Sequence, residues 1–403
     1  ARVLSAAPRL ARIITRRPHV FDGVLEPGFF EATPSLDLWR ETLERSLAQA
    51  RDYEDGLDRF RIFAAEQKFL IGIRLISGVI NPHQAAELFS QLAELLLLAM
   101  VDWIGAIFKE SHGVVPGAEF VLVALGNLGT YELTAGSDLD VMLIYRYPPE
   151  NDESEGALPL HASQYFGRFA QRLISAMKAP TAQGIVYELD FRLRPHGSAG
   201  PIATSLRAFR KHYQEGGAWT WERLAMARAR VMGGSSAFRE EVETAIAEAI
   251  APSENTASMA KDILKMRLLM DKERPARDVW DVKLAKGGLV DIEFIAQTEI
   301  LFGQLQKQRT ISDSLEQLPG KELQNDNVTL ARAHRNFLRV IQVLRLCLDN
   351  EVPTDEGPRG MIELLLQQLD LPDMVSAEAF LKDSQTAVRQ IFVERLKTYA
   401  AQS

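Results

Sequence analysis

The sequence predicts an α+β protein, in which a sheet core with flanking helices is followed by an all-α region. Short apolar runs of β-type composition indicate the strands. Longer stretches with helical periodicity precede and follow them. At 403 residues, the chain exceeds the size at which one hydrophobic core stops growing. We therefore expect a helical N-terminal segment at 1–110, a sheet core at 111–235 and a helical C-terminal domain at 255–403.

The region before the sheet is predicted to be helical at residues 35–74 and 82–110, with Pro82 marking the boundary. Residues 88–108 are apolar enough to raise the question of a membrane span. One amide and two carboxylates interrupt that run, so a buried helix is the better interpretation, and we expect no membrane partner.

Two acids open an apolar strand in residues 126–145, GNLGTYELTAGSDLDVMLIY. Side chains of a strand alternate between faces, so Asp138 and Asp140 project the same way, roughly 7 Å apart, while Leu139 and Val141 point into a core. Magnesium prefers such oxygen ligands, and a pair of ions can clamp the attacking and leaving oxygens of a phosphoryl displacement. The alternative is an acid pair left in solvent at a strand edge.

A second strand is predicted at residues 185–195, IVYELDFRLRP. Its alternation would place Asp190, Arg192 and Arg194 on one face. If this strand lies beside the first, Asp190 completes the metal site, and the two guanidinium groups can hold a polyphosphate. The alternative is a ladder of cross-strand salt bridges.

A glycine bend at Gly129-Thr130 precedes the acid pair. Backbone N–H groups in such a bend can cradle phosphate. The bend could equally be a tight turn without a ligand, because the segment has neither a P-loop nor a dinucleotide-binding glycine pattern.

Composition narrows the class of protein. The single cysteine, Cys347, rules out a disulfide framework, is expected to pack inside a helix, and favours a cytoplasmic location. The seven histidines lack the spacing of zinc ligands. The net charge of −8 argues against a nucleic-acid substrate, which would require a basic surface.

The glycine bend, the Asp-x-Asp strand and the distant third Asp together match the nucleotidyltransferase superfamily. Three further blocks extend the match over most of the chain, and with them the chain resembles the bifunctional glutamine-synthetase adenylyltransferase/adenylyl-removing family. The blocks are DFRLRPHGSAGPI (190–202), AWTWERLAMARARVMGG (218–234) and WDVKLAKGGLVDIEFIAQ (280–297). That family carries two catalytic halves in tandem, and Gly136-Ser137-Asp138-Leu139-Asp140 is similar to the second, adenylylating half. The chain departs from the family at Asn127, where Lys or Arg is usual, and at Thr130, where Gly or Ser is usual.

The resemblance implies a polymerase-β-like nucleotidyltransferase core with a mixed sheet, and a regulatory role for the C-terminal helices. It implies ATP as substrate, two Mg²⁺ ions, and transfer of AMP to a tyrosine of glutamine synthetase, under control of glutamine and a PII-type nitrogen signal protein. The implied catalytic residues and metal ligands are Asp138, Asp140 and Asp190, and the implied nucleotide-binding residues are Gly129, Thr130, Ser137, Arg192 and Arg194. The alternatives are phosphorolytic removal of AMP and a non-catalytic module that senses nucleotide or glutamine.

The later blocks carry further candidates. Residues 219–230 predict one helix, anchored on the sheet by its tryptophans, Trp219 and Trp221, with Arg228 and Arg230 within reach of the nucleotide. Gly287-Gly288 is predicted to start another helix. The resemblance implies that its neighbouring polar residues, Lys283, Asp291 and Glu293, reach the mouth of the site. Long helices are expected at 327–349 and 377–400, and a polar loop at 306–326.

Overall fold

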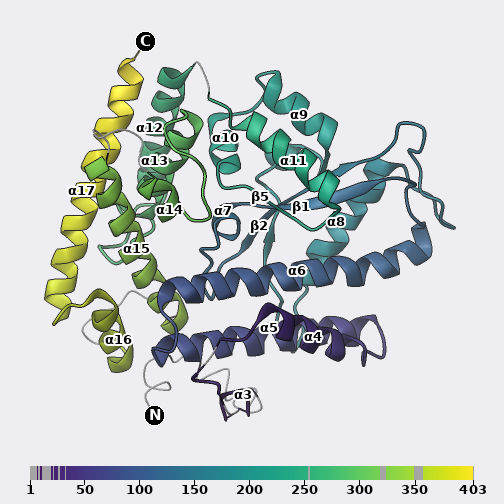
Figure 1. Ribbon diagram of the computed structural model, residues 1–403, viewed down its shortest axis with the longest axis horizontal. Helices are drawn as coiled ribbons and strands as arrows, with labels where there is room; N and C mark the ends of the chain where they lie inside the picture. Colours follow the sequence, from purple (N-terminus) through teal and green to yellow (C-terminus); the bar gives the residue numbers. More distant parts are fainter. Residues whose placement is uncertain are drawn as a thin grey trace.

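The sheet lies at the centre of one half of the molecule, the C-terminal helices form the other half, and two long helices run along the bottom of both in Figure 1. The computed structural model describes residues 7, 10, 20, 22–25, 28–31, 33–252, 255–317, 324–348 and 357–402. The helices before the sheet are α3 (Asp22–Leu25), α4 (Leu36–Leu47), α5 (Tyr53–Ile76) and α6 (Pro82–His112). The short and long helices that alternate with strands are α7 (Gly126–Gly129), α8 (Ala162–Lys178), η2 (Gly197–Ala199), α9 (Leu206–Gln214), α10 (Thr220–Met226) and α11 (Ser236–Ala249). The C-terminal helices are α12 (Thr256–Glu273), α13 (Leu289–Leu301), α14 (Ile311–Glu316), α15 (Gln324–Cys347), α16 (Arg359–Leu369) and α17 (Met374–Ala401).

The sheet is mixed, as expected. Its strands are β1 (Glu119–Ala124), β2 (Leu139–Arg146), β3 (Leu189–Asp190), β4 (Ala203–Ser205) and β5 (Arg230–Met232). β1 pairs antiparallel with both β2 and β5, giving the order β3-β2-β1-β5. β3 and β4 pair in parallel with successive parts of β2, so both occupy the same edge of that strand.

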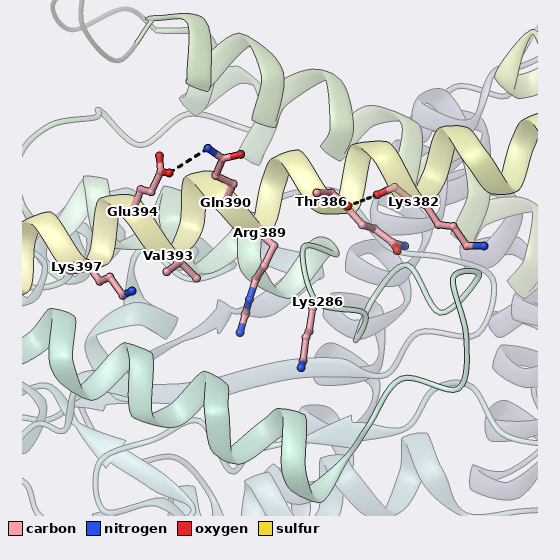
Figure 2. Close-up of a pocket in the computed structure, with 9 residues that line it drawn as sticks. Lys286, Lys382, Thr386, Arg389, Gln390, Val393, Glu394 and Lys397 are labelled. Atoms are coloured by element: carbon pink, nitrogen blue, oxygen red, sulfur yellow. Dashed lines mark hydrogen bonds between the residues drawn. The ribbon is translucent and has the colours of Figure 1, made fainter.

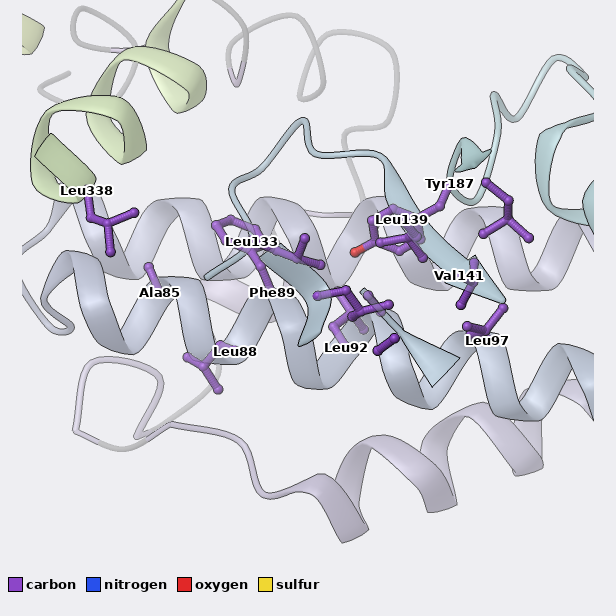
Figure 3. Packing of buried hydrophobic residues seen from close by; sticks show 14 of the residues in the cluster. Ala85, Leu88, Phe89, Leu92, Leu97, Leu133, Leu139, Val141, Tyr187 and Leu338 are labelled. Carbon is purple, nitrogen blue, oxygen red and sulfur yellow. The ribbon is translucent and has the colours of Figure 1, made fainter. Parts of the chain in front are cut away.

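The two faces of β2 are buried against different helices. Leu139 and Val141 share a hydrophobic cluster with α6 and α8, which confirms their expected inward direction. Met142 and Ile144 belong to a second cluster formed with α9 and α11 on the opposite face. Figure 3 shows the first cluster, where side chains of α6 lie beside those of β2. Helices on both faces leave the beginning of β2 as the place where polar residues can remain accessible.

The helix α6 begins with a well-formed cap. The Asn81 side chain accepts hydrogen bonds from the backbone N–H groups of His83 and Gln84, both at 3.0 Å, and the Gln84 side chain accepts one from the Asn81 backbone. By length and composition alone, α6 could cross a membrane. In the structure it packs against α5, α8 and α15, which supports the interpretation of a buried core helix.

Three predicted elements differ in extent. The expected helix at 35–74 is two helices, because Asp52 caps a new helix after a break. The expected loop at 306–326 contains α14, whose Ile311 and Leu315 are buried; residues 318–323 of that loop lie outside the described part of the chain. Cys347 is a buried free thiol, as expected.

The third difference concerns the block with two tryptophans. The helix α10 ends at Met226, because the chain then turns and Arg230 starts a strand that pairs with Ala124 of β1. A single helix through Arg230 is therefore wrong. Trp219 is 69% exposed and does not anchor the helix on the sheet.

The hydrophobic core does not divide at the expected domain boundaries. One cluster contains Leu92 of α6, Leu139 of β2 and Leu338 of α15. The three-part division therefore stays a prediction from sequence.

Candidate active site

The three predicted acids meet at one end of the sheet. Asp138 immediately precedes β2, Asp140 is the second residue of β2, and Asp190 is the last residue of β3. Because β2 and β3 are parallel and in register, Asp140 lies directly opposite Asp190. The expectation that these two segments pair is confirmed.

The acids line a cavity of about 450 Å³ between the sheet and the C-terminal helices. From the sheet side it is lined by Gly126, Asn127, Glu132, Thr134, Gly136, Ser137, Asp138, Asp140, Asp190, Arg192 and Arg228. From the helical side it is lined by Arg274, Lys283, Leu289, Glu293, Leu338, Ile341 and Arg345. One end of the cavity is therefore rich in carboxylates, and the opposite wall supplies cations and aliphatic side chains.

The negative charge around the Asp140 carboxylate is larger than the nearby positive charge. Burial raises its pKa to about 6, and the nearby Asp190 and Asp138 act in the same direction. Arg228 and Lys283 oppose this shift without cancelling it. Such a site gains from a bound cation.

Gly126 makes room for this carboxylate. Its φ is +52°, in the left-handed region, and a Cβ on it would collide with Oδ2 of Asp140. Only glycine fits where the backbone comes so close to the acid.

The other residues of the glycine bend lie behind the cavity wall. Gly129 is packed against the backbone carbonyl of Arg228, and the buried Thr130 hydroxyl donates a hydrogen bond to Oε2 of Glu132 at 2.6 Å. Neither Gly129 nor Thr130 lines the cavity. The part of the bend that does so is Gly126 and Asn127. Ser137 lines the cavity, and its Oγ accepts from the backbone N–H of Thr134 at 2.9 Å.

The two arginines that follow Asp190 do not share a face. The Arg192 side chain is 79% exposed, and its Nε donates to Oδ2 of Asp190 at 2.8 Å. Burial would raise the pKa of Asp190, but the hydrogen bonds from Arg192 outweigh it and hold that pKa below its usual value. The position of Arg192 at the cavity agrees with the sequence-based expectation.

Arg194 turns inward instead. Its guanidinium donates to the backbone carbonyls of Phe191, Gly200 and Pro201 at 2.5 to 3.0 Å, and it does not line the cavity. The predicted strand through Arg194 is wrong, because the chain leaves the sheet after Asp190 and the buried arginine closes the following loop.

Comparison with known proteins agrees with this geometry. The sequence profile of glutamate-ammonia ligase adenylyltransferase matches residues 1–245. The chain belongs to this family. Bifunctional glutamine synthetase adenylyltransferase/adenylyl-removing enzymes of Mesorhizobium japonicum and Brucella suis are each 44% identical to it over 97% of the chain. The enzyme of the same name from Agrobacterium fabrum is 41% identical over 98% of the chain. The chain spans about 40% of the length of these relatives.

Arg228 lies against Asn127, the position at which the family resemblance implied Lys or Arg. Nη2 of Arg228 donates to Oδ1 of Asn127 at 2.5 Å, and Nη1 contacts Oε2 of Glu293 at 2.9 Å. Arg228 is buried and lies in the turn between α10 and β5 rather than on a helix. It thus places positive charge beside the bend.

Glu132 was not singled out by the sequence pattern. It is buried, its Oε2 lies 3.8 Å from Nη2 of Arg228, and its Oε1 accepts from the backbone N–H of Ile311 at 3.3 Å. Burial raises its pKa to about 7, although Arg228 and the Thr130 hydroxyl act against the shift. The available signal was a single charged residue in the otherwise uncharged stretch 126–137.

The three candidate residues around α13, Lys283, Asp291 and Glu293, do not all lie at the cavity. Lys283 and Glu293 line the cavity, as the family resemblance implied. Asp291 is fully buried elsewhere, paired with Arg267 and, at 2.9 Å, with Arg389. The prediction that α13 begins after Gly287-Gly288 is confirmed.

Within the described residues, no three His, Cys, Asp or Glu side chains are arranged to share one metal ion as they stand. Asp190 is turned toward Arg192. The chemistry of the donors nevertheless fits a hard divalent cation, because all three are carboxylates and burial and its acidic neighbours raise the pKa of Asp140.

Proposed function

We propose that this chain catalyses transfer of AMP from ATP to a tyrosine of glutamine synthetase, with release of pyrophosphate. The observation that carries the proposal is the register of β2 and β3, which sets Asp140 opposite Asp190 beside Asp138 in one cavity. The relatives are named for adenylylation and for its reversal, and the chain corresponds to part of their length. The proposal includes a polymerase-β-like nucleotidyltransferase core.

Asp138, Asp140 and Asp190 would hold two Mg²⁺ ions. When bound, these ions would neutralise charge on the phosphates and on the transferred group. The carboxylate of Asp190 becomes available to bind a metal ion when its ion pair with Arg192 breaks. Arg192 can do so readily, because an exposed ion pair contributes little free energy and a phosphate is an equally good partner.

The remaining walls suit a nucleotide. Arg192 and Lys283 supply exposed positive charge for phosphates, and in the described part of the chain the Lys283 ammonium makes no ion pair or hydrogen bond. Leu289, Leu338 and Ile341, from α13 and α15, provide an apolar surface for the adenine ring. The helical region would thus complete the nucleotide site rather than only flank it.

The acceptor must lose a proton, since a tyrosine hydroxyl has a pKa near 10. A general base works best when its pKa is near the working pH. In this proposal Asp190, which would bind the second metal ion, also helps to remove the tyrosine proton, because it lies directly opposite Asp140 at the metal site.

The direction of the reaction is inferred from the Gly-Ser-Asp-Leu-Asp form of residues 136–140. Phosphorolytic removal of AMP remains the second candidate, because the relatives' names include the adenylyl-removing activity. A PII-type signal protein, glutamine as effector and a cytoplasmic setting belong to the same proposal.

A labelling experiment tests the proposal. The chain is mixed with glutamine synthetase, Mg²⁺ and ATP labelled in the α-phosphate, and transfer of label to the protein is measured. Asp140→Asn should abolish transfer, whereas Asp102→Asn, on α6 outside the cavity, should not. Phosphate-dependent release of ADP from adenylylated glutamine synthetase, without labelling, would reverse the direction. Binding of ATP with neither activity would favour a sensing module.

A further inference from the structure

A second cavity, a groove of about 550 Å³, lies along α17. Lys382, Arg389 and Lys397 line it at intervals of seven and eight residues, so they share one face of the helix. Lys286, from the loop before α13, completes the row. Figure 2 shows Lys286, Arg389 and Lys397 on the same side of α17. From Lys382 to Lys397 the row is about 22 Å long, at 1.5 Å per residue.

Most of the positive charge in this groove is not neutralised. Only Arg389 is paired, with Asp271 at 3.1 Å and Asp291 at 2.9 Å. In the described part of the chain, the ammonium groups of the three lysines make no ion pair or hydrogen bond, and all three residues are exposed. The acid in the lining, Glu394, is bonded to Gln390 at 3.0 Å, and Figure 2 shows this pair on the other side of the helix.

The charge of the groove is opposite to that of the chain, whose net charge is −8. A net negative charge repels acidic partners from most of the surface. A row of basic side chains can attract such partners at this one place. The row is therefore a candidate recognition site rather than part of a general basic surface.

We propose that this groove binds an acidic segment of a partner protein. The three lysines are separate point charges spread over about 22 Å, the length of six or seven extended residues at roughly 3.3 Å each. A single phosphate would need converging donors, and the fork of Arg389 is already occupied by two aspartates. A run of carboxylates matches the spacing better.

The groove is physically connected to the catalytic cavity through residues 283–293, which form the loop before α13 and the first turn of that helix. Lys283 and Glu293 face the catalytic cavity, whereas Lys286 lines the groove. Asp291, on the same turn of helix as Glu293, is held by Arg389 of the groove. The ion pair between Arg389 and Asp291 therefore links the groove directly to α13. The same helix carries Glu293, which pairs with Arg228 in the cavity.

The connection is tight because the loop touches α17 at Gly287. Its φ is +81°, and a Cβ there would collide with the backbone carbonyl of Gln385. The Gly287 N–H donates to Oδ2 of Asp291 at 2.7 Å. The loop and α17 therefore move together, and occupancy of the groove changes nucleotide affinity in the cavity; this last step rests on the proposed function.

Binding is tested on the 403-residue chain with a fluorescein-labelled, acetylated hexaglutamate peptide, followed by fluorescence anisotropy. We expect binding that weakens with salt, and a Kd at least about tenfold higher for Lys382→Gln/Lys397→Gln. The matched control is Lys109→Gln/Lys211→Gln, which removes the same charge from α6 and α9 and should bind like the parent chain. Equal loss in both double variants, or displacement of the peptide by millimolar inorganic tripolyphosphate, would overturn the acidic-segment assignment.

Coupling is tested without turnover. The Kd of a non-hydrolysable ATP analogue with Mg²⁺ is measured by calorimetry with and without saturating peptide. We expect a change of several-fold, and by linkage the same factor in peptide affinity when the analogue is present. An unchanged analogue Kd in a chain that binds the peptide overturns the coupling. Neither assay needs glutamine synthetase or transfer, so failure of the proposed function leaves the peptide measurement intact.

Discussion

Two clusters of aspartates lie near the start of α13, and their negative charges are neutralised very differently. Asp271 and Asp291 share two arginines, Arg267 and Arg389, which contact both carboxylates. Of the three acids of the catalytic cavity, Asp190 is paired with the exposed Arg192, and no ion pair of Asp138 or Asp140 is formed within the described residues.

The difference separates a structural cluster from a functional one. In the first cluster, charges are balanced by buried partners, as a stable interior requires. In the second, burial and the neighbouring acids raise the pKa of Asp140, and the buried Arg228 offsets this shift only in part. A cluster of acidic residues is therefore a better indication of a metal site when its carboxylates are not all paired with arginines.

The largest expected effect is the loss of transfer in Asp140→Asn. AMP transfer should fall by roughly two to four orders of magnitude, because several kcal/mol of charge stabilisation in the transition state depends on this group. The thermal midpoint should not fall, since the change removes a repulsive charge. Rate and midpoint are measured on the same preparation, and a rate near that of the parent chain would remove Asp140 from the site.

For Asp291→Asn we expect a loss of stability rather than a specific loss of AMP transfer. This substitution leaves Arg267 and Arg389 with one buried carboxylate fewer, so the free energy of unfolding should drop by about 3–5 kcal/mol. Urea denaturation measures it. A variant as stable as the parent chain would show that the two clusters do not differ in the way described.

Glu132 is a buried acid that is only partly neutralised, because it shares Arg228 with Glu293. It is therefore intermediate between the acids of the two clusters. Its pKa is raised from 4.5 to about 7, so between these values the folded protein holds a proton that the unfolded chain has lost. This group therefore lowers stability as the pH rises through that window. Relative to the parent chain, Glu132→Gln should gain up to roughly 3 kcal/mol between pH 4.5 and pH 7. Denaturation curves at both pH values test it, and a constant difference contradicts the shift.

The smallest effects are expected at the two arginines after Asp190. Arg192→Lys should raise the ATP requirement several-fold with little change in stability, because exposed pairs contribute about 0–1 kcal/mol. Arg194→Lys should lower stability by about 1–3 kcal/mol, since buried carbonyls lose their donors. Kinetics and thermal midpoints of both variants are compared. If Arg194→Lys alters only the ATP requirement, its assignment to the loop is wrong.

Local patterns predicted the parts of the molecule that depend on local geometry. The alternation around Asp138 and Asp140 predicted their common direction, and the boundary at Pro82 predicted the start of α6. The same rule failed at Arg194, because a strand continues only while a neighbouring strand pairs with it, and β3 has no partner beyond Asp190. Arg194 instead donates to the carbonyls of Gly200 and Pro201, farther along the chain, and to that of Phe191.

The network around Arg228 was beyond local patterns for a different reason. Its partners, Asn127, Glu132 and Glu293, come from two regions more than a hundred residues apart in sequence, and no spacing rule relates them. Each residue taken alone resembles an ordinary surface charge. Only the folded structure shows that they form one polar cluster in the wall of the cavity.

The packing of α6 against α15 has a consequence for how the chain is made. A ribosome releases α6 long before α15, and at 5–20 residues per second the intervening stretch, on the order of 200 residues, takes roughly 10–40 s. During that interval a helix with the length and apolar character of a membrane span lacks part of its final cover. Nascent chains of this protein should therefore depend on chaperones until α15 emerges, and fragments that stop before α15 should aggregate.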